Sequence, residues 1–438
     1  MKTKRTRGLE IGKKILTTII LSCCVIAPIS AKDPAPVKEK PFSHRVNNPE
    51  DVPPQVQALF LNWKNQYQKI YNTPEEYIFR LQTFYENYLN IKSQASDLYT
   101  LGLNKFADIT KNEFLSQYSG SIVDLNATPE NSQDFPLKNT LFTKNQKMKK
   151  FSRKKNKRNT KPTHPQTKEH NSYERVLKNL KSAQNSTTVD WTKYLPPVKN
   201  QKQCSCSWAF SSIAAVEFQL NKQKNKPNAT DLKIQSLSEQ ILLDCDTEVL
   251  DCQQGGSVKN ALNFMKSGAF LDTGTGLEPA YVGVKQQCAK NQTLAAKVTK
   301  VIPIKPGDED AMVEAVNNGV VAVSLDGFGI MNYIGGIFNG DCSHGLNHAM
   351  VIVGYGEETV VKKNDFSGDN EMGESEVIKY WVLRNSWGDD WGEGGYIRVM
   401  RGDDGLMYGV CGIYYAGFSV EVEAVDSSGA EWFGGEEM

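Results

Sequence analysis

The chain has 438 residues, of which 39% are hydrophobic, so it can form a globular core together with a second module. Its formal net charge is only +1, which excludes a strong overall attraction to nucleic acid or to an anionic membrane surface. No nucleic-acid partner is therefore expected, and any charged partner has to be argued from a local segment.

The first 31 residues have the organisation of a cleavable secretory signal peptide. Basic residues crowd Met1–Lys14, and the mostly apolar run Ile15–Ile29 ends beside the small residues Ser30 and Ala31. This run is shorter than the roughly 18 apolar residues that a membrane span needs, so no stable span is expected. We therefore expect export, to a lysosome or vacuole or to the extracellular space.

Residues 55–118 are expected to form a helical domain that carries two spaced patterns. Large apolar side chains recur at three- and four-residue steps from Val56 to about Ser93, and Pro74 interrupts them, which predicts two helices. The first pattern consists of Glu76, Arg80, Phe84, Asn87 and Ile91, and the second of Gly102, Asn104, Phe106 and Asp108.

Three polar segments are expected to lie outside the folded cores. Residues 119–188 are predicted to be a disordered basic linker, because Lys144–Lys161 has ten Lys or Arg in 18 residues. A plain solvated linker is the default interpretation, and an activation site or an arm that contacts a polyanion are the alternatives. The acidic stretch Glu357–Lys379 is expected to be a surface loop, and the acidic tail at 424–438 is expected to be loose.

Residues 189–423 are predicted to form the larger domain, of the α+β class. A helix is expected from Ser207 to about Lys222, and short apolar runs such as Ala349–Gly354 and Tyr380–Leu383 follow late in the chain. A helical first half followed by a strand-rich second half is typical of α+β proteins.

Three segments of this domain carry side chains suited to nucleophilic catalysis: Gln201–Trp208 (Gln-Lys-Gln-Cys-Ser-Cys-Ser-Trp), Leu346–Ala349 with its His, and Asn385–Gly388 (Asn-Ser-Trp-Gly). In this order they resemble the active-site segments of the papain family of cysteine peptidases.

The two upstream patterns resemble the propeptide of cathepsin L-like members. The resemblance implies a papain-like two-lobe fold, with a helical lobe and an antiparallel β-barrel-like lobe, preceded by a helical inhibitory propeptide. It implies a peptide or protein ligand in the cleft and no cofactor.

The resemblance assigns a role to each polar residue of these segments. Ser207 stands at the nucleophile position, where the family has cysteine. His348 and Asn385 correspond to the catalytic histidine and its orienting amide, and Gln201 to the side-chain donor of the oxyanion hole. Cys206, one residue before the nucleophile position, is a possible substitute nucleophile.

The resemblance also implies a substrate pocket and a disulfide framework. The pocket residues are Gly255, Gly256, Ser257, Val258, Leu346, Ala349, Ala416 and the shielding Trp387. They are small or apolar, so an apolar ligand residue is expected there. The implied disulfides are Cys204–Cys252, Cys245–Cys288 and Cys342–Cys411, which leaves Cys206 as a thiol. No metal is expected, because the histidines and cysteines lack zinc-ligand spacing.

Three interpretations remain open for the function. The protein is an exported papain-like module with little or no proteolysis and a binding or regulatory cleft, a weak hydrolase that uses Ser207, or a cysteine peptidase that uses Cys206. The first is favoured, because a hydroxyl cannot form the resting thiolate–imidazolium pair on which thiol peptidases rely. One residue along a helix rotates a side chain by about 100°, which would aim the Cys206 sulfur away from His348.

Overall fold

The computed structural model describes residues 51–123, 188–225, 229–246, 251–272, 280–289, 292–342, 345–361, 375–402, 406–425 and 431–432. The predicted signal peptide, nearly all of the predicted basic linker and most of the acidic tail lie outside these residues. Within the described ranges, no helix is both long and apolar enough to cross a membrane.

Residues 51–123, called the pro-region here, form a small helical domain. Its elements are α1 (Pro54–Gln66), α2 (Pro74–Ser93), β1 (Tyr99–Leu101) and α3 (Lys111–Gln117). The prediction of two helices separated at Pro74 is confirmed. Pro74 is the first residue of α2, where its missing N–H costs no helical hydrogen bond, and the Thr73 side chain caps the helix by accepting from the Glu76 N–H.

Residues of the two spaced patterns fasten α2 and the loop before it to α3 and to the segment that precedes α3. Arg80 donates to the Glu113 carboxylate at 2.9 Å, and the Asn87 amide donates to the Ala107 carbonyl at 2.9 Å. The Asp108 carboxylate accepts from Lys69 at 2.9 Å. Beneath these polar contacts α1 and α2 share an apolar core, formed by Val52, Val56, Phe60, Trp63, Leu81, Phe84 and Ala107.

The larger domain has most of its helices in its first half and most of its strands in its second half. The helices are α5 (Ser207–Lys224), α6 (Glu239–Cys245), α7 (Val258–Phe264) and α8 (Glu309–Asn318), with short 3-10 turns at Thr192–Tyr194 and Val410–Gly412. The strands are β2 (Val189–Asp190), β3 (Ala269–Phe270), β4 (Gln292–Ile304), β5 (Val321–Leu325), β6 (Tyr333–Phe338), β7 (His348–Val361), β8 (Ser375–Arg384), β9 (Tyr396–Arg401), β10 (Gly417–Ala424) and β11 (Glu431–Trp432). The predicted α+β class, preceded by a helical domain, is confirmed.

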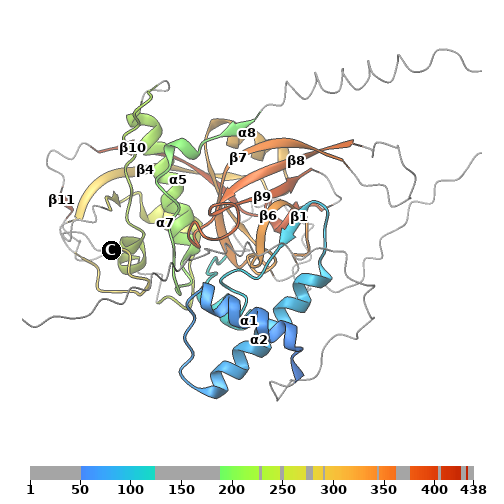
Figure 1. Cartoon of the computed structure of the whole chain (residues 1–438). Helices are drawn as coiled ribbons and strands as arrows, with labels where there is room; N and C mark the ends of the chain where they lie inside the picture. The colour runs from blue at the N-terminus through green and yellow to red at the C-terminus, as the bar shows by residue number, and fades with distance from the viewer. Residues whose placement is uncertain are drawn as a thin grey trace, which may run out of the picture. The chain divides into compact units, whose positions relative to one another are not determined.

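The described strands form one sheet in the order β1-β6-β9-β8-β7-β5-β10-β4-β11. Neighbours are antiparallel except β6 and β9, which run parallel. Helix α5 packs against β7 and β10 and is buried on almost every side, as is typical of a central core helix (Figure 1). The helix predicted from Ser207 is thereby confirmed. The arrangement puts the first turn of α5 beside the first residue of β7.

The pro-region docks on the larger domain through a strand and an aromatic cluster. Strand β1 pairs antiparallel with β6, which extends the sheet by one strand. Phe106 and Phe114 pack edge-on against Trp387, with ring centroids 5.4 and 5.2 Å apart. The Asn104 amide donates to the Met331 carbonyl at 2.8 Å. Residues of the second pattern therefore serve both the internal packing of the pro-region and its contact with the larger domain.

Two expectations for polar segments were partly wrong. The stretch Glu357–Lys379 is not all loop: its ends continue β7 and β8, with pairing from Glu357 with Lys379 to Val361 with Ser375. β-branched residues there favour extended backbone despite the acidic composition. In the tail, β11 pairs with the Gln292–Thr293 end of β4. The edge backbone groups of β4 can accept another strand, whatever the charge of the tail.

Three disulfides close loops around the helical half of the domain and near β7. They are Cys204–Cys252, Cys245–Cys288 and Cys342–Cys411, the pairs that the resemblance implied. Within the described residues Cys206 is the free thiol.

Candidate active site

Ser207 is the first residue of α5, and its side chain faces the start of β7. Its hydroxyl accepts a hydrogen bond from the backbone N–H of Ala349 at 3.1 Å. Among the described residues this N–H is the hydrogen-bond partner of the hydroxyl, and Ser207 is fully buried. The residue predicted at the nucleophile position therefore lies at a helix N-terminus, where unpaired N–H groups favour negative charge.

His348 is the first residue of β7 and is oriented by Asn385. Its Nε2 lies 2.8 Å from Asn385 Oδ1, and this oxygen also accepts from the Ser386 N–H. Because Oδ1 is an acceptor, Nε2 carries the proton and Nδ1 has a lone pair. Nδ1 has no hydrogen-bond partner among the described residues. Burial lowers the pKa of His348 to about 4, although the Asn385 contact partly opposes the shift. The imidazole is thus neutral near pH 7.

Trp387 covers this pair from the side of the pro-region. Its ring lies 4.5 Å from the His348 ring, centroid to centroid, with 32° between the planes. Its indole N–H donates to the Tyr118 carbonyl at 2.8 Å. Trp387 therefore shields the His348–Asn385 hydrogen bond from water and also contacts the pro-region.

Gln201 and the Ser207 backbone direct their N–H groups to one carbonyl oxygen. The Gln201 amide donates to Ser119 O at 3.3 Å and to Cys204 O at 2.9 Å, while its own oxygen accepts from the Ser386 hydroxyl. The Ser207 N–H donates to the same Ser119 oxygen at 3.4 Å. Two donors that converge on a carbonyl are the geometry of an oxyanion hole.

The pro-region continues from Ser119 along the predicted substrate pocket. Gly120 and Ser121 donate their N–H groups to the Asn347 carbonyl at 2.8 and 3.0 Å. Gly256 donates to Gly120 O and accepts from the Ile122 N–H, both at 2.8 Å, as a parallel bridge. The described pro-region thus occupies the site in which a peptide is expected to bind.

The other predicted pocket residues surround this bridge. Gly255 adopts a left-handed conformation, φ +73°, and a Cβ there would lie 2.3 Å from Gly120 O. Ser257 caps α7, whose first residue Val258 is buried in the same apolar cluster as Ala349. Leu346 lies over Gly412, and Ala416 accepts a hydrogen bond from the Ser324 N–H at 3.1 Å.

Ser324 and Ser205 contact the pro-region, and sequence reasoning did not identify them as contact residues. The Ser324 hydroxyl lies 2.8 Å from the Ser121 hydroxyl, and the Ser205 hydroxyl donates to Ser116 O at 2.8 Å. The sequence signal for Ser324 is indirect, since it requires the register that places Ser324 opposite Ala349 between β5 and β7. The sequence signal for Ser205 is its position two residues before Ser207, in the segment that precedes α5.

Cys206 is the N-cap residue of α5 and is turned into the protein interior. It is fully buried, and its Sγ lies 3.0 Å from the Tyr281 hydroxyl, which itself donates to Gln201 O at 2.6 Å. A tyrosine hydroxyl has a single proton, so the thiol is the donor in the Cys206–Tyr281 contact. Burial raises the pKa of Cys206 to about 12. Its environment therefore favours a protonated, inert thiol.

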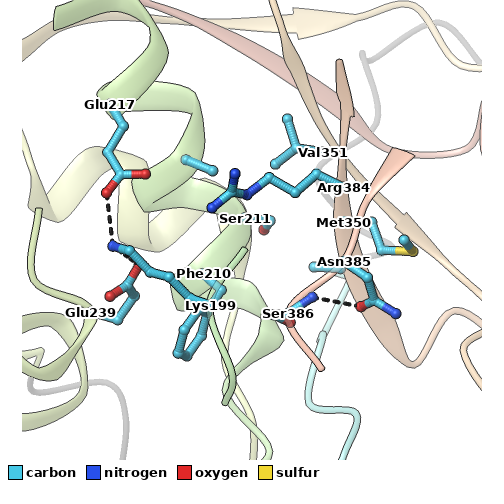
Figure 2. A pocket seen from close by; sticks show the side chains of 12 residues that line it. Lys199, Phe210, Ser211, Glu217, Glu239, Met350, Val351, Arg384, Asn385 and Ser386 are labelled. Carbon is cyan, nitrogen blue, oxygen red and sulfur yellow. Dashed lines mark hydrogen bonds and ion pairs between the residues drawn. The ribbon is translucent and has the colours of Figure 1, made fainter. Parts of the chain in front are cut away.

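Behind Asn385 lies a buried cluster of charges that the sequence did not indicate. Lys199 Nζ lies 2.7 Å from Glu217 Oε1 and 2.6 Å from Glu239 Oε1 (Figure 2). Burial raises the pKa of Glu239 to about 7, although Lys199 opposes the shift. The same pocket is lined by Asn385 and Ser386. The cluster therefore borders the segment that orients His348. Among the described residues, this cluster included, no group of His, Cys, Asp or Glu is arranged to hold a metal ion.

Comparisons with known proteins agree with this geometry. Residues 185–420 match the papain family cysteine protease model, and residues 60–114 match the cathepsin propeptide inhibitor domain. The chain is 31% identical to papain of Carica papaya over 82% of this chain and 85% of papain. It is 30% identical to the senescence-specific cysteine protease SAG12 of Arabidopsis thaliana, over 85% of this chain and 92% of that protein. A solved structure, the recombinant stem bromelain precursor, superposes with a TM-score of 0.56 at 27% identity, covering 84% of this chain and 98% of that one. The chain belongs to the papain family of cysteine peptidases and carries the family's inhibitory propeptide domain.

Proposed function

We propose that this papain-family proenzyme is an exported protein whose cleft binds peptide segments and hydrolyses them weakly or not at all. The observation that carries the proposal is the position of the Ser207 hydroxyl. It accepts from the Ala349 N–H, while His348 Nδ1, the atom that would take its proton, has no partner among the described residues. A serine nucleophile needs a base in hydrogen-bond reach.

The chemistry of a hydroxyl at this position supports the same conclusion. A helix N-terminus and a histidine can lower a thiol pKa from about 8.5 to between about 3.5 and 7.5, so a cysteine would be ionised at rest. An alcohol stays protonated and needs the histidine as a general base in every turnover. With the pro-region in the cleft, burial lowers the pKa of His348 to about 4, so in this state it is a weaker base than one whose pKa lies near the working pH. The orienting group is a neutral amide, and replacing Asp by Asn in a serine protease costs about 10⁴ in turnover.

Cys206 offers no efficient replacement. Its thiol is buried, donates to Tyr281 and has a pKa raised to about 12. A nucleophilic cysteine needs an exposed thiolate beside a cationic partner. This environment supports a structural role for Cys206 in the proposed module.

Slow hydrolysis by Ser207 is the second candidate. It is favoured by the two donors on the Ser119 carbonyl, because Gln201 and the Ser207 N–H retain the arrangement of an oxyanion hole. Such donors can contribute about 3 to 4 kcal/mol to transition-state stabilisation, independently of the nucleophile.

The pro-region is the proposed inhibitor and first occupant of the cleft. Its backbone contacts to Gly256 and Asn347 block access to Ser207 and His348, which are both fully buried beneath it. Export is proposed from the basic and apolar N-terminal segment, and the three disulfides suit an oxidising compartment.

Covalent labelling tests the proposal. After the pro-region has been removed by an added acid protease, the protein is treated with a thiol-directed epoxide or with a fluorophosphonate, and the modified residue is located by mass spectrometry. The Ser207→Cys variant is the control and should react with the epoxide, which shows that the cleft is open. The proposal expects wild type to take neither label. Fluorophosphonate on Ser207 would favour the weak hydrolase, and epoxide on Cys206 would overturn the proposal.

A further inference from the structure

The Ser121 and Ser324 hydroxyls form a buried polar contact in the cleft. Their oxygens lie 2.8 Å apart, and the two residues are 7% and 3% exposed. Ser121 is also the residue that bridges Gly256, so its side chain is fixed by backbone hydrogen bonds on both sides. A ligand side chain is therefore held against a serine hydroxyl in the pocket that was expected to prefer apolar residues.

Ser324 is a polar group on an otherwise small, apolar wall. It lies opposite Ala349 in the β5–β7 pairing, and its N–H donates to the Ala416 carbonyl. Among the described residues, the Ser121 hydroxyl is the hydrogen-bond partner of the Ser324 side chain. An apolar ligand residue in the same place would bury the Ser324 hydroxyl without a partner, a penalty larger than the gain from making one ordinary hydrogen bond.

The residue before Ser121 is constrained as strongly. Gly120 has φ +113°, and a Cβ there would lie 2.0 Å from the Ser205 carbonyl oxygen. This is backbone against backbone, so no side-chain rotation can relieve it. Both polar groups of the Gly120 backbone are also engaged, its N–H with Asn347 and its carbonyl with Gly256. Other L-residues are thereby excluded from a ligand that binds as the pro-region does.

We infer that Ser324 makes this cleft selective for peptide segments with a Gly–Ser or Gly–Thr pair, the hydroxyl residue lying at the Gly256 bridge. The inference rests on the proposed function of the cleft as a peptide-binding site and names the chemistry of its ligand. The hydroxyl of Ser324 supplies the discrimination between hydroxyl and apolar side chains, and the close approach of Ser205 supplies the requirement for glycine. The Ser205 hydroxyl, which binds the Ser116 carbonyl, adds affinity that does not depend on ligand sequence.

The test uses the full chain, with its own pro-region as the ligand. Hydrogen exchange at the amides of residues 120–122 reports how often this segment detaches, and amides of β7 serve as an internal reference for global opening. The experiment compares proteins with Ser, Thr, Ala or Val at position 121, each combined with Ser or Ala at position 324. With Ser324 present, we expect Ser121→Ala and Ser121→Val to lose protection about tenfold, while Ser121→Thr retains it.

In the Ser324→Ala background the preference should disappear, so that Ser121→Val is protected at least as well as serine. Ser205→Ala is the matched control, and it should lower protection by the same factor whatever residue stands at 121. Equal or greater protection of Ser121→Val in the presence of Ser324 would overturn the inference. If the valine variants fail to fold, the comparison of Ser121→Thr with Ser121→Ala decides. Exchange measures binding and not hydrolysis, so an active wild-type enzyme would refute the proposed function and leave this result unaffected.

Discussion

The backbone N–H of Ala349 donates to the Ser207 hydroxyl at 3.1 Å, and this contact spans the two halves of the candidate active site. Ala349 directly follows His348 in β7, so the strand that supplies the histidine also donates a hydrogen bond to the hydroxyl at the nucleophile position. His348 Nδ1 is left without a partner among the described residues. The site has the frame of a papain-like peptidase, but its base and its nucleophile are not connected by a hydrogen bond.

Folding stability should report the buried state of His348. Its folded pKa is about 4, and an unfolded histidine titrates near pH ~6.5. The unfolded state takes up a proton first as the pH falls. The contribution of His348 to the free energy of unfolding is therefore complete above pH ~6.5 and is lost as the pH falls toward 4. The total loss is on the order of 3 kcal/mol.

Urea unfolding of wild type and His348→Gln from pH 8 to 3.5 measures this effect. The difference in unfolding free energy should shift in favour of the variant as the pH falls from 6.5 to 4. The raised pKa of Glu239 has the opposite effect: the stability that it contributes is lost as the pH rises through about 7. Because wild type and variant both contain Glu239, this effect cancels in the comparison. A difference that does not change with pH would contradict the assignment.

Removing Lys199 should be severely destabilising. Lys199→Met leaves the buried carboxylates of Glu217 and Glu239 without their cation, and breaking a buried ion pair from one side costs about 3 to 5 kcal/mol. The double variant Lys199→Met/Glu239→Gln should recover part of the loss, because one buried carboxylate has been removed. Denaturant unfolding at pH 8 measures both. A double variant less stable than Lys199→Met would refute the account of this cluster.

Gly120→Ala should release the pro-region from the cleft. The new Cβ would collide with the Ser205 carbonyl, so exchange at amides 120–122 should accelerate at least tenfold. Gly345→Ala is the matched control, because Gly345 also has positive φ, +93°, but nothing lies within 4 Å of its added Cβ. Similar exchange at amides 120–122 in both variants would contradict the prediction, because it would show that a Cβ at position 120 does not weaken the binding of the pro-region.

Cys206 should be unreactive in the folded protein. It is fully buried and its pKa is raised to about 12, so little thiolate exists near neutral pH. Iodoacetamide at pH 7.5 should modify Cys206 only after denaturation, as followed by intact mass. Stoichiometric modification of native protein would mean that the thiol is exposed, and would restore it as a candidate nucleophile.

Much of the fold could be predicted from local sequence signals. Pro74 separates α1 from α2, and the apolar run after Ser207 becomes the central helix, because both signals act within one or two helical turns. The positions of His348, Asn385 and Gln201 follow from motifs whose spacing carries the site. The strand extensions around the Glu357–Lys379 stretch were missed because acidic composition hid a β-branched pattern.

The missed site residues depend on tertiary register. Ser324 meets Ser121 because β5 pairs with β7 in one register and the pro-region lies across both strands, which no local pattern encodes. Lys199, Glu217 and Glu239 come from three separate segments and meet only in the packed core. Such convergent groups become visible when the fold is known.

Hydrolysis of a fluorogenic dipeptide with an apolar second residue, at mildly acidic pH, tests the central claim most directly. Wild type, Ser207→Cys and Cys206→Ala are compared after identical removal of the pro-region. A matched substrate with serine in place of the apolar residue runs alongside, so that a preference of the cleft for hydroxyl side chains does not hide activity. Activity confined to Ser207→Cys is the result this account predicts, since a thiol can form an ion pair with His348 where the hydroxyl cannot. Wild-type activity that disappears in Cys206→Ala would contradict it and make Cys206 the nucleophile.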